Sequence, residues 1–463
     1  MEATVSDERP SPEGPATFRE VFAQREYRAI FAASTLSWIG DYLARAAVTL
    51  LIYQETQSVA LSAAAFAASY LPWLVGGPLL ATIAERHPYR QVMVVCDVVR
   101  AALMVAIAIP GMPVEVILLL LFATTLANPP SQAAKSALIP LVLTGDRLVV
   151  GLSLNASMGQ AAQVVGYLLG AGLATVSPTA ALLVNATTFL SSAVLVRLGV
   201  DDHPPAMTSA HRSHLLRETA AGFRLVFGNP VLRSIAVLVF SAMLFSIVPE
   251  GLAAAWANER ADGGLDAGAA QAVIMAAGPV GFILGGLVIS RAFAPARRLA
   301  LIRPLAVLAP LMLVPSLLDP PPVVVAVLAA ACGFAVAGLM PVANGLFVQA
   351  LPNGFRARAF GVMATGVQVI QGMAVLVTGL LAERFPIPAV VGVWSAAGVV
   401  LMSVVALRWP SGSTIDAAVT AARQAGGVGV PPGPVAAPRA PRRGTANLPA
   451  PGGPASRADV TSP

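Results

Sequence analysis

The chain has 463 residues and a formal net charge of +6; 56% of its residues are hydrophobic and only 11% are charged. An ordinary soluble domain carries about 25% charged residues, so this composition excludes a soluble globular protein and predicts an integral membrane protein. The positive charge does not indicate a nucleic-acid-binding protein, because the cations are spread over short gaps between apolar runs.

The chain begins with a polar segment, residues 1–28, that lacks the short apolar core of a signal peptide. We expect this segment to be a flexible cytoplasmic N-terminus. Twelve apolar segments follow, each about as long as the 20 residues that cross a bilayer as a helix. Their approximate bounds are 29–53, 59–83, 91–110, 114–134, 148–175, 178–198, 231–256, 267–290, 299–317, 322–346, 357–382 and 388–408.

The twelve segments fall into two sets of six, over residues 29–198 and 231–408, separated by the polar stretch 199–230. Two near-equal halves are typical of a duplicated transporter. The predicted fold class is therefore an all-α membrane protein with twelve transmembrane helices in two pseudo-symmetric six-helix bundles.

The basic residues predict the orientation. With the N-terminus inside, the cytoplasmic gaps and helix ends of the body carry 16 Lys and Arg, whereas the outer gaps carry two, Arg260 and Arg384. This asymmetry follows the positive-inside rule. We expect a multi-pass protein of the cell membrane with both termini in the cytoplasm.

Two segments outside the spans have their own composition. The linker 199–230 contains a helical apolar pattern from Ser213 to Gly228, which predicts an amphipathic helix on the inner membrane face. The last segment, 409–463, holds 10 Pro and 8 Gly without a hydrophobic period, and we expect a disordered cytoplasmic tail.

The gap after the second span carries a recognisable motif. Residues 76–90 place Glu85, Arg86 and Arg90 at the acidic and basic positions of a short cytoplasmic loop, and residues 286–298 form a degraded copy in the second half. The pattern resembles the signature of the major facilitator superfamily. Ala81 stands where that signature prefers glycine.

Further stretches, at 37–41, 97–101 and 128–132, resemble the multidrug, macrolide and siderophore exporter branch of that superfamily. The resemblance covers about residues 20–408 and implies alternating access between two bundles. It departs from the drug antiporters at two places. The fourth span lacks their arginine-glutamine motif, and Tyr167 replaces a proline usual in the fifth.

Asp41 and Arg45 lie near the middle of the first span, where each charge costs about 2.5–3.5 kcal/mol unless it is compensated. One interpretation is an i,i+4 salt bridge that only fixes the helix. The other makes Asp41 a carboxylate that binds a proton during transport, with Arg45 setting its acidity.

Asp97 and Arg100 lie only 6–9 residues into the third span, near the motif loop. We expect them to form a cytoplasmic gate with Glu85, Arg86 and Arg90. The alternative is a static network at the helix end.

Glu250 follows Pro249 near the outer end of the seventh span. It is either an interfacial carboxylate or a group that binds a proton or substrate. Amide side chains in the spans are candidates for the cavity, with interhelical hydrogen bonding as the alternative. The amides assigned to the cavity are Asn155, Gln163, Asn185, Gln368 and Gln371.

The sequence contains no catalytic, nucleotide-binding or metal-ligand motif, so we expect neither an enzyme nor a cofactor or metal site. The predicted function is proton-coupled export of amphipathic, antibiotic-like small molecules by a monomer in the lipid bilayer. Alternatives are an uptake porter for a nutrient or siderophore on the same fold, and a membrane scaffold that does not transport.

Overall fold

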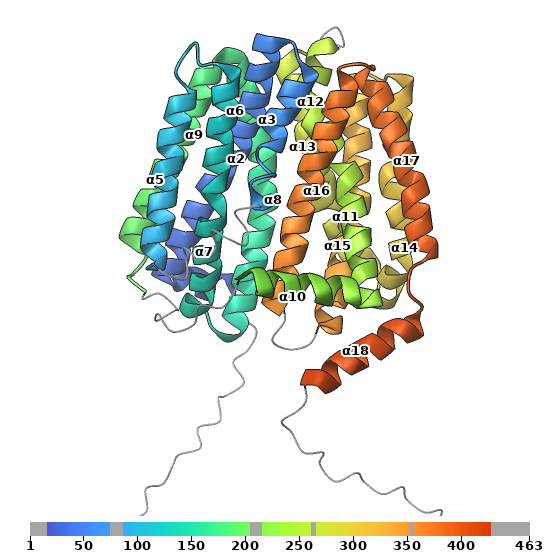
Figure 1. Ribbon diagram of the computed structural model, residues 1–463. Helices are drawn as coiled ribbons and strands as arrows, with labels where there is room; N and C mark the ends of the chain where they lie inside the picture. Colours follow the sequence, from blue (N-terminus) through green and yellow to red (C-terminus); the bar gives the residue numbers. More distant parts are fainter. Residues whose placement is uncertain (1–15, 75–86, 204–214, 261–264, 352–355, 427–463) are drawn as a thin grey trace, which may run out of the picture. The chain divides into compact units, whose positions relative to one another are not determined.

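The computed structural model describes residues 16–74, 87–203, 215–260, 265–351 and 356–426, and every regular element in these ranges is helical (Figure 1). The first half contains α1 (Phe18–Ala23), α2 (Arg25–Thr56), α3 (Val59–Ala67), α5 (Tyr89–Ile107), α6 (Val114–Leu126), α7 (Asn128–Val142), α8 (Gly145–Val176) and α9 (Pro178–Gly199). The second half contains α11 (Pro230–Ser246), α12 (Val248–Glu259), α13 (Ala267–Ala292), α14 (Pro295–Leu311), the 3₁₀ turn η1 (Val314–Leu318), α15 (Pro322–Ala350), α16 (Arg356–Ala382) and α17 (Ile387–Leu407).

Within the described ranges, nine helical segments are long and apolar enough to cross a membrane. They match nine of the twelve predicted spans. Two further predicted spans correspond to α2 and α5, which contain the Asp–Arg pairs of the first and third spans. The predicted span 59–83 begins as α3, and its part from residue 75 onward lies outside the described residues.

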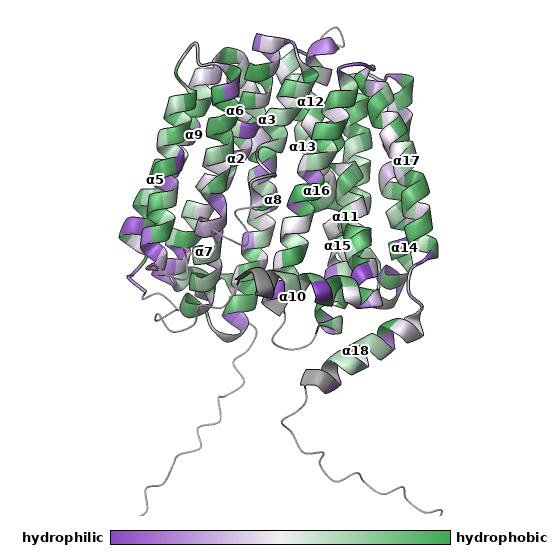
Figure 2. Ribbon diagram, in the orientation of Figure 1, coloured by the Kyte–Doolittle hydropathy of each residue, from purple (hydrophilic) through white to green (hydrophobic). Residues whose placement is uncertain are grey.

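Large apolar side chains face outward along the helices, as they would toward lipid. Val176 is 86% exposed, Leu407 is 85% exposed and Leu119 is 67% exposed. Figure 2 shows hydrophobic residues along the length of the helices, with hydrophilic residues gathered toward their ends. Such outward-facing apolar surface is expected where the solvent is a bilayer.

Two predicted spans are interrupted helices. The span at 114–134 consists of α6 and α7, which meet at Ala127 just before Pro129 and Pro130. The span at 231–256 consists of α11 and α12, which meet at Ile247 before Pro249. Proline has no N–H to donate and its ring crowds the preceding turn, so a helix restarts there more readily than it continues.

Close helix packing depends on glycine at two helix crossings. At Gly170 in α8, a Cβ would overlap the Leu43 carbonyl of α2. At Gly281 in α13, it would overlap the Ala330 carbonyl of α15. These contacts join helices within each half, where a larger side chain would force the backbones apart at a cost of about 1–3 kcal/mol.

The two halves also pack against each other, α8 against α13 and α3 against α16. Gln271 in α13 donates a hydrogen bond to the Ala46 carbonyl of α2, 2.9 Å away, and Gly268 packs against Thr175 of α8. All of these residues lie toward the helix ends where α8 leads into α9 and α13 begins. We call this contact region the seam.

Helix α10 (Leu215–Gly228) coincides with the helix predicted over 213–228 and lies across the opposite end of the bundle (Figure 1). Its Val226 is fully buried against the second half, together with Leu232 and Ile235 of α11. Phe223 and Phe227 stack on each other with ring centroids 5.8 Å apart.

The tail prediction needs a correction. Residues expected to be disordered from 409 onward instead begin with helix α18 (Gly412–Gly426). Its Ile415 and Ala422 are buried, and Ile415 packs in the same hydrophobic cluster as Val405 and Trp409. The Pro- and Gly-rich composition of the tail hid the apolar period of this short amphipathic helix. The helix covers apolar surface at the end of the second half. Residues 427–463 lie outside the described residues.

Candidate functional site

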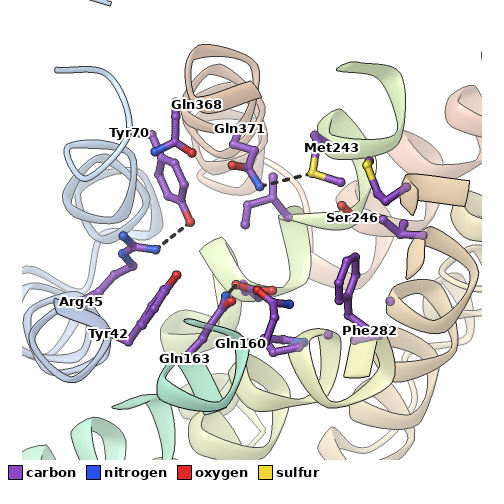
Figure 3. Close-up of a pocket in the computed structure, with 18 of the residues that line it drawn as sticks. Tyr42, Arg45, Tyr70, Gln160, Gln163, Met243, Ser246, Phe282, Gln368 and Gln371 are labelled. Atoms are coloured by element: carbon purple, nitrogen blue, oxygen red, sulfur yellow. Dashed lines mark hydrogen bonds between the residues drawn. The ribbon is translucent and has the colours of Figure 1, made fainter. Parts of the chain in front are cut away.

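A cavity of about 370 Å³ lies between the two halves. The first half lines it with Tyr42, Arg45, Tyr70, Gln160 and Gln163. The second half contributes the polar residues Ser246, Glu250, Asn344, Gln368 and Gln371, and large apolar side chains that include Met243, Phe282 and Met340. Figure 3 shows these groups converging from opposite sides on one space.

The interruption at Ile247 positions Glu250 in this cavity. Glu250 lies in the first turn of α12, where the unpaired N–H groups of a helix favour a carboxylate. It is only 8% exposed. Its Oε2 accepts hydrogen bonds from the Tyr167 hydroxyl at 3.1 Å and from Gln163 Nε2 at 3.3 Å. Since both donors belong to α8, these bonds join the second half to the first.

Arg45 lies on the other side of Tyr167. Its Nη1 donates to the Tyr70 hydroxyl at 2.7 Å and to the Tyr167 hydroxyl at 3.4 Å. Its guanidinium also lies over the rings of Tyr42 and Tyr70, 5.0 and 4.6 Å from their centroids. We call Arg45, Tyr167 and Glu250 the cavity charge chain, because one phenol links a half-buried cation to a buried carboxylate between the two halves.

The rest of the lining is neutral. Four glutamines and an asparagine face the cavity among aromatic and methionine side chains. Gln371 has a weak contact with sulfur, from its Nε2 to Met243 Sδ at 3.7 Å (Figure 3). Amides can donate and accept at once, so this lining suits an apolar solute that carries a few polar groups.

A second group of charges, buried or half-buried, lies within the first half. Arg100 of α5 pairs with Asp41 of α2, donates to Ser37 at 3.2 Å, and lies 3.8 Å from Asp97. Asp97 in turn accepts a hydrogen bond from Ser192 of α9 at 2.6 Å. We call Asp41, Asp97, Arg100 and Ser192 the first-half charge cluster.

The structure corrects the expected partner of Asp41. An i,i+4 pair with Arg45 is one interpretation of the sequence, but Asp41 binds Arg100 and Arg45 turns to the tyrosines. The two residues therefore separate into the two groups, and Asp41 is absent from the cavity lining. Asp41 pairs with Arg100 rather than with Arg45 because the Arg100 guanidinium of α5 is only 3% exposed and needs a counter-charge.

The expected gate stays a prediction, because the described residues include only part of it. Arg90 pairs with Asp202 at 3.1 Å and donates to the Val200 carbonyl at 3.3 Å. Arg90 and Asp97 are seven residues apart on α5, about 10 Å along the axis, and they bind different partners in this structure. The remaining gate candidates, Glu85 and Arg86, lie outside the described residues.

The predicted cavity amides divide into two sets. Gln163, Gln368 and Gln371 line the cavity. Asn185 is fully buried against α2, where a Cβ on Gly40 would overlap its side-chain oxygen, and Asn155 is buried in α8. These two amides are absent from the cavity lining.

Sequence reasoning missed the tyrosines. Tyr42, Tyr70 and Tyr167 surround Arg45, and Tyr167 is completely buried. A signal was present, because all six tyrosines of the chain lie between residues 27 and 167. A phenol in an apolar span requires a hydrogen-bond partner, which a buried arginine or carboxylate can supply.

No group of three or more His, Cys, Asp and Glu that could hold a metal ion occurs among the described residues. Both cysteines, Cys96 and Cys332, are free.

Comparison with known proteins gives a consistent family. Residues 30–329 match the family model described as Major Facilitator Superfamily. Among curated proteins, the chain is 22% identical over 153 residues to macrolide efflux protein A of Streptococcus pyogenes, a match over 32% of this chain and 37% of that protein. The match thus spans little more than a third of the relative.

Solved structures share the fold at low identity. A POT family transporter in complex with 5-aminolevulinic acid aligns with a TM-score of 0.66 at 12% identity, over 83% of this chain and 96% of that one. A mutant of the nucleoside transporter NupG aligns with a TM-score of 0.66 at 14% identity, over 83% of this chain and 100% of that one. With the helical fold, the cavity between halves and the matching family model, the chain belongs to the Major Facilitator Superfamily, a family of multi-pass membrane transporters.

Proposed function

We propose that this transporter exports amphipathic small molecules from the cytoplasm across the cell membrane, driven by protons that move inward. The observation that carries the proposal is the cavity charge chain, in which Arg45, Tyr167 and Glu250 link the two halves beside an otherwise neutral cavity. The site has few fixed charges, so lipophilic solutes with a few polar groups fit it better than strongly charged metabolites.

The packing of the halves supports alternating access. The seam closes the cavity at the end opposite α10, through contacts such as that of Gln271 with Ala46. The arginine distribution predicts that α10 lies on the cytoplasmic side, and the seam is then proposed as the outer closure. On this assignment, export requires the seam to open.

Glu250 is the proposed coupling residue. As a carboxylate it accepts bonds from Tyr167 and Gln163 of the opposite half, which hold α12 against α8. A proton on Glu250 removes the charge that makes these bonds strong, and so loosens the link between the halves. Asp41, the candidate from sequence, already binds Arg100 within one half and has no comparable link.

Two observations bear on the direction of transport. Export is supported by the regional similarity to a macrolide efflux protein. The alternative, an uptake porter on the same fold, is supported by structural neighbours that are named as peptide and nucleoside transporters.

The test is flux in proteoliposomes of known protein orientation with an imposed proton gradient, using lipophilic fluorescent antibiotics as probes. Wild-type protein should move the probe against its gradient, opposite to the protons. Glu250→Gln should lose at least tenfold of this uphill flux yet still exchange probe between the two sides. Asp41→Asn is the matched carboxylate control and should retain uphill flux.

Three results would contradict the proposal. Uphill flux by Glu250→Gln equal to that of wild type would remove Glu250 from coupling. Loss of coupling in Asp41→Asn alone would return that role to the sequence candidate. Probe movement in the same direction as protons would establish uptake.

A further inference from the structure

One contact at the seam joins the halves through a helix end. Glu383, just beyond α16 of the second half, accepts hydrogen bonds from the Ser58 hydroxyl and from the Ala60 backbone N–H, the latter at 2.8 Å. Ser58 is the N-cap of α3 in the first half, and its hydroxyl oxygen accepts from Leu61 N at 3.1 Å. The second half therefore supplies a carboxylate to the unpaired N–H groups at the start of a first-half helix.

This contact depends on close approach of α3 and α16. One turn before Glu383, a Cβ on Gly379 would overlap the Ala63 side chain and lie 3.7 Å from Ala60 Cα. Separation of the two helices by a few ångströms breaks both bonds to Glu383. The two hydrogen bonds to the Glu383 carboxylate therefore form only when the seam is closed, and they stabilise that closed form.

The chemistry of the contact makes it insensitive to pH in the neutral range. The Ser58 hydroxyl, followed by the backbone N–H groups of α3, lowers the pKa of Glu383 below its ordinary value of 4.5. A carboxyl group with a lowered pKa stabilises the closed form above its ordinary pKa, and this stabilisation is lost as pH falls through the lowered value. The bond therefore holds at pH 5–8 and weakens only in more acidic solution.

Other charged groups surround this end of the seam. Tyr53 of α2 lies within electrostatic range of both Glu259 and Glu383. Arg384 follows Glu383 in the chain, and Arg260 is paired with Asp319. Glu55 at the end of α2 is exposed and carries the same charge as Glu383.

We infer that Glu383 and the N-terminus of α3 form a clasp that holds the seam closed and must release whenever the transporter opens at this end. The inference rests on the alternating access of the proposed function, but not on its direction or its coupling ion. Glu383 is a positioning residue here: it sets the balance between two conformations and touches no substrate.

The test measures the distance between two spin labels, one on each half, in purified full-length protein without substrate. The labels replace Gln54 at the exposed end of α2 and Val323, 50% exposed at the start of α15, after Cys96→Ser and Cys332→Ala substitutions. Wild type at pH 7.5 should give mainly the short distance. Glu383→Gln should raise the ratio of long to short distances about threefold to fivefold, the scale of an exposed charged contact.

Two comparisons separate the clasp from a general charge effect. Glu55→Gln removes a carboxylate from the same end and should leave the distances as in wild type. Ser58→Asp keeps an N-cap for α3 but opposes Glu383 with a second carboxylate, so it should favour the long distance more than Glu383→Gln. Adding Glu383→Gln to Ser58→Asp should restore the short distance, because the amide can donate to the new carboxylate.

The pH series gives an independent check. Wild type should keep its short distance from pH 8 to 5 and approach the distribution of Glu383→Gln only as the pH falls through the lowered pKa of Glu383, while Glu383→Gln should change little. Identical distributions for wild type and Glu383→Gln at neutral pH would overturn the clasp, as would an equal effect of Glu55→Gln. Neither outcome depends on probe flux, so a failed clasp remains distinguishable from a failed exporter.

Discussion

The cavity charge chain and the first-half charge cluster both place arginine and carboxylate in the membrane-spanning body, but they differ in what they connect. The first-half charge cluster joins α2, α5 and α9 of one half through Arg100, which is 3% exposed. The cavity charge chain passes from Arg45 through one phenol to Glu250 and crosses between the halves.

The difference indicates two uses of buried charge. Ion pairs within one rigid bundle are satisfied in every conformation, so they fix the packing of its helices. Hydrogen bonds between bundles are made in one conformation and lost in another, so a change in their charge alters the balance between conformations. Substitutions in each group can break or sharpen this contrast.

The largest expected effect comes from the first-half charge cluster. Arg100→Leu removes the guanidinium paired with Asp41 and Asp97 and leaves Lys135 as the cation within their electrostatic range. The loss of one partner from a buried pair costs about 3–5 kcal/mol. We expect this variant to unfold at a markedly lower temperature in detergent, or to fail to accumulate in membranes.

Arg45→Leu is the matched arginine substitution in the cavity charge chain. The variant should fold, since Glu250 keeps both of its α8 donors. It should lose uphill transport, because the cation that Tyr167 links to Glu250 is gone. Equal midpoints of thermal unfolding for the two variants would break the contrast between the clusters.

An intermediate effect is expected at the phenol of the cavity charge chain. Tyr167→Phe removes the hydroxyl that lies between Arg45 and Glu250, and a lost hydrogen bond to a charged group is worth about 1.5–3 kcal/mol, or a factor of about 10–150. We expect at least a tenfold loss of proton-coupled flux.

Tyr42→Phe is the control, because Tyr42 lines the same cavity and packs edge-to-face on Tyr167 with ring centroids 5.2 Å apart. It should retain most of the flux. Equal losses in both variants would show that removal of either cavity hydroxyl impairs transport and that the link through Tyr167 is not special.

The smallest effect is expected where the sequence predicts a gate. Arg90 and Asp202 form an ion pair with 19% and 52% of their side chains exposed, and such pairs contribute about 0–1 kcal/mol. Asp202→Asn should lower the unfolding temperature by a few degrees at most, and less at high salt. A transport loss as large as that of Tyr167→Phe would support Arg90 as a gate residue.

The architecture was predictable because it depends on composition and period. Long apolar segments and the linker helix follow from sequence alone. The pairing of charges was not predictable from sequence. Asp41 could reach Arg45 along its own helix, whereas it reaches Arg100 of α5 only through tertiary packing. Spacing along one helix predicts neighbours on that helix and says nothing about the helix opposite.

The cavity was predictable in part for the same reason. Glu250, Arg45 and three glutamines were identified as polar groups that an apolar span must explain. Tyr167 was seen as a departure from a motif, and its role as a bridge needed α2, α8 and α12 in their folded positions. α18 escaped notice because its few apolar residues are diluted by a tail rich in proline and glycine.

Lys135 has a practical consequence of a different kind. It is the one lysine in the sequence, it is 8% exposed, and its ammonium lies 4.1 Å from the centre of the Trp38 ring. In the folded protein the chain therefore presents no accessible lysine to amine-reactive dyes. The rate of covalent modification at Lys135 therefore measures how often α7 separates from α2, and no residue has to be introduced for the measurement.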